Sequence, residues 1–290
     1  MCNSSGDSII QNAMTVDVED YYQVAAFSKN IARSDWDKME SRVVRNTEHI
    51  LQIFDDYAVK ATFFVLGWVA RREPGLVRNI VNQGHEIASH GYSHQLIYTQ
   101  TPELFKEETI RSKRLLEDIS GKVVNGYRAA SYSITKKSLW ALDILAEAGF
   151  KYDSSVFPVH HDNYGIPGSA TEPYVINSQN GRKIIEYPLS TYKVFGQMLP
   201  VAGGGYFRLY PYWLSRHFYK NINKNKKPFV FYMHPWEIDP NQPRIKASWF
   251  SEFRHYNNLE KSETRLARLI SEFSFSTMKN ILINQGLIRE

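Results

Sequence analysis

The strongest constraint on the fold is the alternation of short apolar segments with amphipathic ones along most of the 290 residues. Apolar, β-branched and aromatic runs predict strands, and apolar residues at helical spacing predict helices. The predicted strands are Met14–Val18, Lys60–Gly67, His85–Ser89, Val123–Arg128, Phe150–Tyr152, Lys183–Tyr187 and Pro228–Met233. The predicted helices are Asn46–Tyr57, Pro74–Asn82, Pro102–Ile119, Ser138–Ala148, Pro211–Asn223 and Leu259–Ile283, with a break near Phe273–Ser276.

Strand and helix units that alternate in this way imply right-handed crossovers and a mostly parallel sheet. A hydrophobic content of 43% is enough for a sizeable core. About seven such units predict an α/β fold, a distorted (β/α)7-type barrel in a single domain. Residues 160–210 interrupt the alternation, and we expect loops with short strands there, beside the active face.

Five reactive side chains stand at or just after the ends of predicted strands. They are Asp17, His90, Arg128, Asp153 and His234. In a parallel barrel these strand ends share one face, where active sites are built from the strand-to-helix loops. The pattern therefore predicts a single site assembled from five strands.

The segment Ser89-His90-Gly91-Tyr92-Ser93-His94 is the sharpest local motif. Two imidazoles four residues apart face the same way if the segment turns as a helix, and they can then share one metal ion. The simpler alternative is a pair of surface histidines in a loop. The preceding strand and the acidic residues upstream favour a metal site.

The acidic residues are Asp17, Glu19 and Asp20. On a strand, Asp17 and Glu19 point to one face and Asp20 to the other. Carboxylates so close repel one another unless a cation offsets their charge. One would ligate the metal and another would act as general base, whereas the alternative is an ordinary acidic loop or helix N-terminus.

Three further residues have both a catalytic and a structural interpretation. His234 follows a buried strand and can donate a proton to a leaving amine, although a core histidine is an equally ordinary reading. Arg128 can orient a carboxylate by a bidentate contact, and Asp153 can hold an imidazole in its useful tautomer. Both can instead belong to structural ion pairs.

Taken together, these motifs resemble the polysaccharide deacetylase family, also called the NodB homology or carbohydrate esterase 4 family, from about Thr15 to Trp236. SHGYSH is similar to its metal-binding histidine motif, and GYRAA to the motif whose arginine orients the catalytic base. YDSS resembles a groove-lining motif, and MHPW resembles the motif of the catalytic acid. The resemblance implies Asp17 as base, Arg128 and Asp153 as supporting residues, and His234 as acid.

Two departures from the family pattern bear on the site. The usual first motif has two adjacent aspartates, whereas this chain has Asp17-Val18-Glu19-Asp20. Strand alternation favours Glu19 as the metal ligand, with Asp20 as the alternative. Ala130 stands where the third motif usually has proline, which predicts a looser loop around Arg128.

The segments DVEDYYQVAAF, GGGYFR and FRHYNNLEKSETRLARL resemble a subgroup associated with bacterial exopolysaccharide gene clusters. This resemblance implies a catalytic domain over residues 1–239 and a helical C-terminal extension over residues 240–290 that packs on it. It also implies a role in envelope polysaccharide or O-antigen synthesis.

The resulting hypothesis is metal-dependent hydrolysis of N-acetyl groups on an amino-sugar polymer or oligosaccharide. Zn²⁺ suits two imidazoles and a carboxylate, with Co²⁺, Ni²⁺ and Mn²⁺ as alternatives. The polar and aromatic residues expected to contact the sugar are Tyr92, Tyr132, Tyr206, Arg208 and Trp236. Two rival functions are an amidase acting on a small cyclic amide and a catalytically silent carbohydrate-binding protein.

Charge and composition argue against other classes of function. A net charge of +5 without helix-turn-helix or zinc-finger spacing disfavours nucleic-acid binding. Cys2 is the single cysteine, so an intramolecular disulfide is impossible. No apolar run is long enough to span a bilayer, and the first residues lack the features of a signal peptide. A cytoplasmic protein is therefore expected.

Overall fold

The seven predicted strands form the parallel part of one sheet in the computed structural model, which describes residues 10–161, 164–178 and 181–289. Cys2 lies outside the described residues. These seven parallel strands are β1 (Gln11–Val18), β2 (Thr62–Val65), β3 (Glu86–Ser89), β4 (Gly126–Tyr127), β5 (Tyr152–Asp153), β7 (Lys183–Glu186) and β10 (Val230–Met233), and an eighth, β11, is described below. Their order is β10-β1-β2-β3-β4-β5-β7, and β6 (Tyr174–Asn177) pairs antiparallel with β7 at the edge.

The predicted α/β architecture with seven parallel strands is confirmed. Within the described residues no strand pairing joins the β6–β7 edge back to β10, so the hydrogen-bonded path is open. Strand β1 lies inside the sheet, with Val16 paired to Met233 on one side and to Phe63 on the other. Val16 and Phe63 have no exposed surface, as expected for parallel strands covered on both faces.

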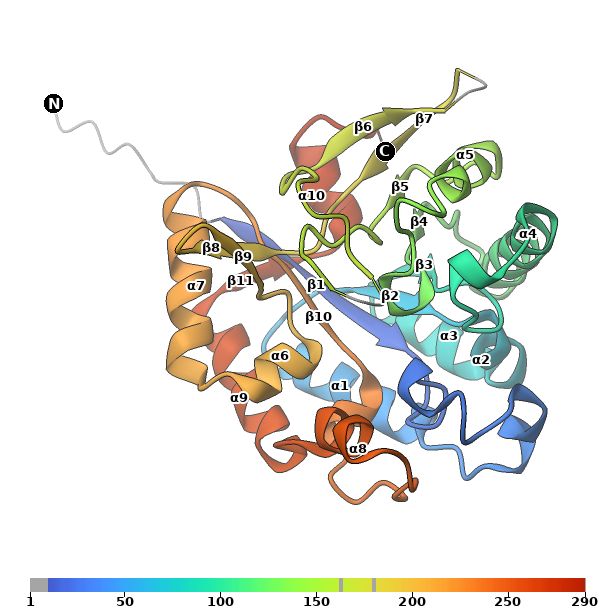
Figure 1. Ribbon diagram of the computed structural model, residues 1–290, viewed down its shortest axis with the longest axis horizontal. Coiled ribbons are helices and arrows are strands. Elements are labelled where there is room, and N and C mark those ends of the chain that lie inside the picture. The colour runs from blue at the N-terminus through green and yellow to red at the C-terminus, as the bar shows by residue number, and fades with distance from the viewer. Residues whose placement is uncertain (1–9, 162–163, 179–180, 290) are drawn as a thin grey trace, which may run out of the picture.

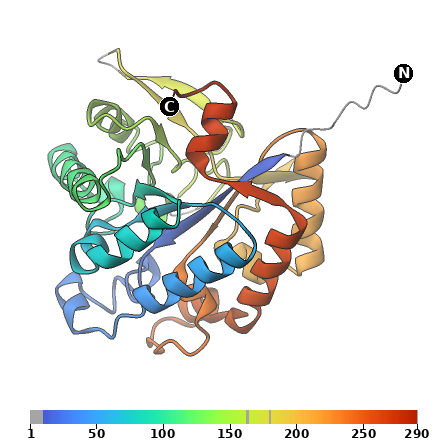
Figure 2. The same ribbon diagram turned by 180° about the vertical axis from the view of Figure 1, so that it is seen from behind.

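Helices surround this sheet, and Figure 2 shows α1, α3, α9 and α10 on its rear side. The helices are α1 (Val43–Asp56), α2 (Gly67–Arg72), α3 (Pro74–Asn82), α4 (Pro102–Ser120), α5 (Trp140–Glu147), α6 (Gly204–Leu209), α7 (Tyr212–Lys224), α8 (Trp249–Tyr256), α9 (Ser262–Glu272) and α10 (Met278–Asn284). Helix α4 shows why the sequence signals work. The Thr101 side chain caps its first turn by accepting a hydrogen bond from Leu104 N, and Gly121 ends it in the left-handed region.

The segment that interrupts the alternation contains short strands, as expected. Strands β8 (Thr191–Val194) and β9 (Gln197–Pro200) form a separate antiparallel hairpin. Short 3-10 turns occur at η1 (Ala25–Phe27), η2 (Arg33–Lys38), η3 (Ile97–Thr99), η4 (Ala130–Tyr132), η5 (Pro235–Ile238) and η6 (Leu259–Lys261).

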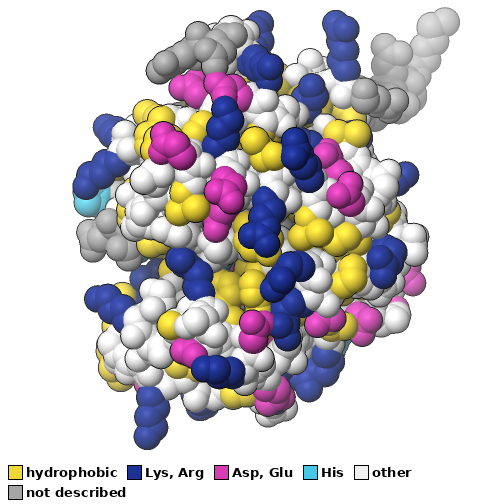
Figure 3. Space-filling view, turned by 90° about the vertical axis from the view of Figure 1, so that its right-hand side faces the viewer, with side chains coloured by type: hydrophobic (Ala, Val, Ile, Leu, Met, Phe, Trp, Pro, Cys, Tyr) yellow, Lys and Arg dark blue, Asp and Glu magenta, His cyan; other side chains and the backbone are white. Residues whose placement is uncertain are grey.

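The break predicted near Phe273–Ser276 is a strand rather than a loop. Strand β11 (Ser274–Ser276) pairs in parallel with the first residues of β1, so the end of the chain contributes to the main sheet. In the part of the chain that the structure describes, no helix is both long enough and apolar enough to cross a membrane. On the face shown in Figure 3, Lys and Arg side chains are interspersed with Asp and Glu around a band of apolar side chains.

Candidate active site

Residues that follow three strands meet at the carboxyl edge of the sheet. Glu19 comes directly after β1, His90 after β3 and His234 after β10. Strands β10, β1, β2 and β3 are consecutive neighbours, and parallel strands end at the same edge. The fold therefore brings together side chains that are up to 215 residues apart in the sequence.

Glu19, His90 and His94 form a cluster of three buried donors. Their ligand atoms all lie within 4.8 Å of one another. The Glu19 Oε2 atom is 2.6 Å from His94 Nε2 and 4.0 Å from His90 Nε2. No more than 8% of any of the three residues is exposed. One carboxylate and two imidazoles at such distances are a donor set that suits a divalent metal.

A loop rather than a helix brings the two histidines together. Gly91 and His94 both have positive φ angles, of 73° and 53°, so the histidines do not face the same way through a helical turn. The carbonyls of Gly91 and Tyr92 accept hydrogen bonds from Gly67 N and Trp68 N, which belong to the first turn of α2. The free N–H groups at the start of that helix thus hold the loop in place.

Hydrogen bonding also orients the first histidine. His90 Nδ1 lies 2.9 Å from the carbonyl oxygen of Arg128. Because a carbonyl can only accept, Nδ1 carries the proton and the Nε2 lone pair faces the cluster. The backbone of the third motif therefore sets the tautomer that metal binding requires.

Asp20, the alternative ligand, is occupied elsewhere. Its Oδ2 atom accepts hydrogen bonds from Ser41 Oγ, Arg42 N and Val43 N, at 2.9, 2.8 and 3.2 Å. Those groups stand at the start of α1, where a carboxylate satisfies free N–H groups and favours the helix dipole. Glu19 is thus the carboxylate that the fold presents to the histidines.

Charge within the cluster also suits a metal. Burial alone would raise the pKa of Glu19, but the imidazoles of His94, His234 and His90 lower it to about 2. Burial lowers the pKa of His90 to about 4. At neutral pH the carboxylate is therefore ionised and the His90 ring is neutral, which are the protonation states of metal ligands.

Two atoms of the cluster lack hydrogen bonds. Glu19 Oε2 and His94 Nδ1 are buried and have no hydrogen-bond partner among the described residues. Although Glu19 Oε2 is 2.6 Å from His94 Nε2, the pair does not have the geometry of a hydrogen bond. A buried carboxylate oxygen without a donor is costly, and a cation between these groups would remove the cost. The residues present therefore fit a divalent metal.

Asp17 is held beside this cluster by Arg128. The guanidinium donates from NH1 to Asp17 Oδ1 at 2.7 Å and to Thr15 Oγ1 at 2.8 Å. Its Nε and NH2 atoms donate to the carbonyl and the hydroxyl of Ser154, at 3.2 and 3.1 Å. Arg128 has no exposed surface, so four hydrogen bonds fix both the arginine and the Asp17 carboxylate. The contact with Asp17 is through one nitrogen and is not bidentate.

His234 lies on the other side of Glu19. Its Nε2 atom is 3.6 Å from Glu19 Oε1, and its Nδ1 atom is 2.7 Å from Glu237 Oε1. Burial alone would lower the pKa of His234, but the hydrogen bond with Glu237 and the nearby Glu19 raise it to about 8. The ring is therefore largely protonated at neutral pH.

Glu237 is the residue that sequence reasoning missed. It accepts hydrogen bonds from the backbone N–H of His234 at 3.0 Å and from Arg208 Nε at 2.7 Å. Burial alone would raise the pKa of Glu237, but Arg208 and His234 lower it to about 2. Glutamate three residues after the first residue of a turn is a capping-box pattern, and this signal could have found it.

Asp153, for which an imidazole partner was expected, does not contact His234. Its carboxylate accepts hydrogen bonds from Ser155 N and Ser155 Oγ, at 3.1 and 2.7 Å, and it lies next to the buried Glu186. Burial raises the pKa of both Asp153 and Glu186, the second also because of the first. Glu237, rather than Asp153, orients the imidazole in this structure.

The predicted sugar contacts fall into two groups. The Tyr132 hydroxyl donates to Asp17 Oδ2 at 3.4 Å, and the partly exposed Tyr206 has its hydroxyl 3.3 Å from that of Tyr164. Tyr132 therefore contacts Asp17 directly, and Tyr206 contacts Tyr164, whose ring packs against that of Tyr132. Trp236 is 5% exposed and stacks between His234 and His255, at 5.0 and 4.1 Å.

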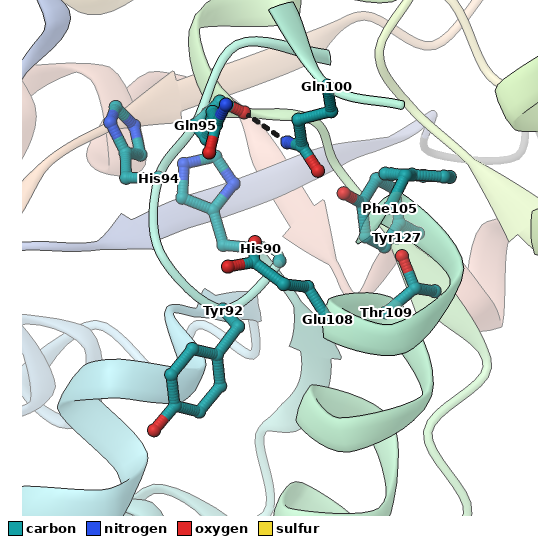
Figure 4. Close-up of a pocket in the computed structure, with 11 residues that line it drawn as sticks. His90, Tyr92, His94, Gln95, Gln100, Phe105, Glu108, Thr109 and Tyr127 are labelled. Carbon is teal, nitrogen blue, oxygen red and sulfur yellow. Dashed lines mark hydrogen bonds between the residues drawn. The ribbon is translucent and has the colours of Figure 1, made fainter. Parts of the chain in front are cut away.

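Tyr92 and Arg208 are committed to packing. Figure 4 shows the Tyr92 ring pointing away from the His90 and His94 rings, and the Arg111 guanidinium lies 3.8 Å above it. Arg208 is 2% exposed, and its remaining donors reach backbone carbonyls of residues 254, 255 and 257. The cavity in Figure 4, beside the histidine loop, has about 10 Å³, room for about one water and none for a sugar.

Gly203, the first of three consecutive glycines, packs closely against the backbone of β10. A Cβ on Gly203 would lie 2.1 Å from the carbonyl oxygen of Tyr232 in β10, and Gly203 has a φ of 125°. Gly203 therefore allows the backbone to approach a strand of the same chain closely. Gly203 is the N-cap of α6, the helix that carries Arg208.

Comparison with known proteins agrees with this geometry. Residues 29–152 match the family model described as polysaccharide deacetylase. Over these residues the chain is similar to polysaccharide deacetylases. Residues 154–283 match a second model, a domain of unknown function named DUF3473. The deacetylase match covers Arg128 and the histidine pair, whereas Glu237 and Arg208 lie in the second region.

Individual relatives support the same family. The chain is 29% identical over 140 residues to a peptidoglycan deacetylase of Helicobacter pylori, covering 48% of this chain and 43% of that protein. It thus spans less than half the length of that curated relative. A Mycobacterium smegmatis structure described as a polysaccharide deacetylase superimposes with a TM-score of 0.61 at 20% identity, over 94% of this chain and 88% of that one.

The fold is also similar to that of an allantoinase. The Puue allantoinase structure superimposes with a TM-score of 0.57 at 16% identity, covering 93% of this chain and 87% of that one. At such identities these matches establish the fold alone. They agree with the distorted barrel of deacetylases that the sequence predicted.

Proposed function

We propose that this protein is a metal-dependent hydrolase that removes acetyl groups from an N-acetylated amino-sugar polymer or its oligosaccharide precursor. The observation that carries the proposal is the buried Glu19–His90–His94 cluster with Asp17 and His234 as its neighbours. A divalent cation bound there, with Zn²⁺ best suited to the donor set, would supply Lewis-acid polarisation of the acetyl carbonyl and of water.

Asp17 would act as the general base. Its carboxylate accepts hydrogen bonds from Arg128 NH1 and from the Tyr132 hydroxyl, so its orientation is fixed. A base that is held in place accepts the proton of the attacking water without reorganising. The contribution of Arg128 is to orient this carboxylate.

His234 would act as the general acid. Its Nδ1 proton is held by Glu237, so the Nε2 proton is the one available to the departing amine. Glu237 is in turn fixed by Arg208. After the C–N bond breaks, the amine takes the proton from Nε2, and acetate and the free amino sugar leave.

The biological setting belongs to the same proposal. Relatives named as peptidoglycan and chitooligosaccharide deacetylases support an N-acetylated glycan as substrate. The subgroup motifs described above favour a role in exopolysaccharide or O-antigen synthesis, on a precursor in the cytoplasm. We further propose residues 1–239 as the catalytic domain and residues 240–290 as an extension that packs on it.

The test combines metal content with acetate release. Purified protein is assayed on N-acetylglucosamine oligomers before chelation, after chelation and after metal is restored, and bound metal is measured by mass spectrometry. We expect about one metal per chain and chelator-sensitive acetate release. His90→Ala should lose both metal and activity, whereas His49→Ala, which alters an exposed histidine paired with Glu263, should keep both.

The alternatives predict different results. Metal without acetate release, together with hydrolysis of a hydantoin-like cyclic amide, would assign the site to another amide substrate. Sugar binding without hydrolysis of either substrate would indicate a silent carbohydrate-binding protein. A protein that binds no metal after reconstitution would contradict the role of the histidine pair.

A further inference from the structure

Helix α8 carries an outer face of large, exposed aromatic side chains. Trp249, Phe250 and Phe253 are 77%, 59% and 43% exposed, and we call these three residues the α8 aromatic face. The Trp249 and Phe253 rings are stacked, with centroids 5.6 Å apart and 15° between their planes. Three exposed aromatic residues on eight helical residues form a contiguous apolar patch, which in a folded protein marks an interaction surface.

The opposite side of the same helix is packed in the usual way. His255 is 3% exposed and lies against Trp236 and Phe27, with ring centroids at 4.1 and 4.8 Å. Helix α8 therefore has one side in the core and one aromatic side facing out. The helix is anchored, so the outward aromatic residues are held in place rather than left on a loose segment.

Cations flank this face without partners of opposite charge. Arg244, Lys246 and Arg254 are exposed, and none of them forms an ion pair among the described residues. The nearest acidic residue on the helix, Glu252, accepts a hydrogen bond from Ala247 N.

We propose that the α8 aromatic face, with Arg244, Lys246 and Arg254, docks on the surface of an anionic phospholipid bilayer. Tryptophan and phenylalanine favour the headgroup boundary, and cations nearby are attracted to anionic lipids. The face is one side of a helix and not a groove, so it suits a flat partner better than an enclosed ligand. The proposal does not depend on the deacetylase activity.

Docking would bring the candidate active site close to the lipid surface. Trp236 stacks against both His234 and the inner side of α8 through His255. The Arg254 carbonyl also accepts a hydrogen bond from Arg208, which supports Glu237. The aromatic face and the site are thus two sides of one packed unit.

The experiment is co-sedimentation of the full chain with vesicles of phosphatidylcholine alone or of phosphatidylcholine mixed with phosphatidylglycerol. We expect binding to the mixed vesicles only, weakened by salt. Changing Arg244, Lys246 and Arg254 to Gln should weaken binding by roughly 100-fold, at about fivefold per cation. Replacing Trp249, Phe250 and Phe253 by Ser should reduce binding at least as much.

A matched control uses Trp213, which is 68% exposed on α7. Trp213→Ser should bind vesicles as the unchanged protein does, and circular dichroism verifies that each variant is folded. Brominated lipids should quench fluorescence less in Trp249→Phe than in Trp213→Ser. Absence of binding to the mixed vesicles, equal loss in the Trp213→Ser control, or binding of soluble acidic polysaccharide in place of vesicles would overturn the proposal.

Discussion

Two arginines, one on each side of the Glu19–His90–His94 cluster, hold a carboxylate in place, but they are held by different kinds of structure. Arg128 and Arg208 are 0% and 2% exposed, and each donates to a carboxylate oxygen at 2.7 Å. Arg128, which follows β4, is fixed by Thr15 and Asp17 of β1 and by the backbone and hydroxyl of Ser154, which follows β5. Arg208 is fixed by three backbone carbonyls at the C-terminal end of α8 and just beyond it.

The difference teaches that the two proposed catalytic groups depend on different parts of the chain. Arg128 acts directly on Asp17, so the proposed base is supported within the sheet. Arg208 acts on Glu237, which acts on His234, so the proposed acid is supported by residues beyond 239. Backbone carbonyls at a helix end have free acceptors and a partial negative charge, which favours a guanidinium there.

The largest effects are expected from substitutions in the Asp17–Arg128 pair. Asp17→Asn should lower the kcat of acetate release by about 10²- to 10⁴-fold, because the general base is lost while the shape is kept. Arg128→Met should also destabilise the fold by about 3–5 kcal/mol, since it leaves a buried carboxylate unpaired. Full activity in Asp17→Asn, with metal bound, would remove Asp17 from the role of base.

The Glu237 carboxylate, which Arg208 holds, is expected to stabilise the fold against acid. The pKa of Glu237 is about 2 in the fold against an ordinary value of 4.5, because Arg208 and His234 outweigh burial. A depressed folded pKa contributes stability above the unfolded pKa, and this stability is lost as pH falls from about 4.5 towards 2. The contribution is on the order of 3 kcal/mol.

Urea unfolding of the unchanged protein and of Glu237→Gln between pH 5 and pH 2 measures this contribution. The free energy of unfolding should fall with acid less steeply in the variant. Glu19 is present in both proteins, so its own titration cancels in the difference. Parallel curves for the two proteins would show that Glu237 is not stabilised by its partners.

A smaller effect sharpens the comparison. Arg208→Lys keeps the charge but loses the planar fork that contacts Glu237 and three carbonyls together. We expect kcat to fall by roughly 10- to 100-fold through misplacement of His234, with KM and metal content little changed. Arg216→Lys, which alters a partly exposed pair with Glu272, is the matched control and should leave kcat unchanged. A rise in KM alone would instead support the sugar-binding role first expected for Arg208.

The sequence was sufficient to predict the seven parallel strands, because buried parallel strands are continuous apolar runs that local patterning detects. The same reasoning placed His90, Arg128 and His234 at one edge. Alternation along β1 favoured Glu19 over Asp20, and the structure places Glu19 beside the histidines and Asp20 at the start of α1.

What the sequence left open was decided by contacts between distant residues. Asp153 and Glu237 are both acidic residues at strand ends, and only the packing of α6 and α8 shows which of them reaches an imidazole. The spacing of the two histidines left the shape of their segment open, and the first turn of α2 holds it as a loop. Arg208 looked available to a substrate because its carbonyl partners are 46 to 49 residues further along the chain.

The pairing of β1 has a consequence for how the molecule folds. Ala13 pairs with Val230 in β10 and with Ser276 in β11, more than 200 residues away in both cases. Such contacts close very long loops, which slows folding and keeps intermediates exposed to aggregation. The strand that carries Asp17 is synthesised well before β10 and β11, which are two of its three neighbours. During synthesis it therefore lacks these two partners, and we expect it to be the segment that chaperones need to cover.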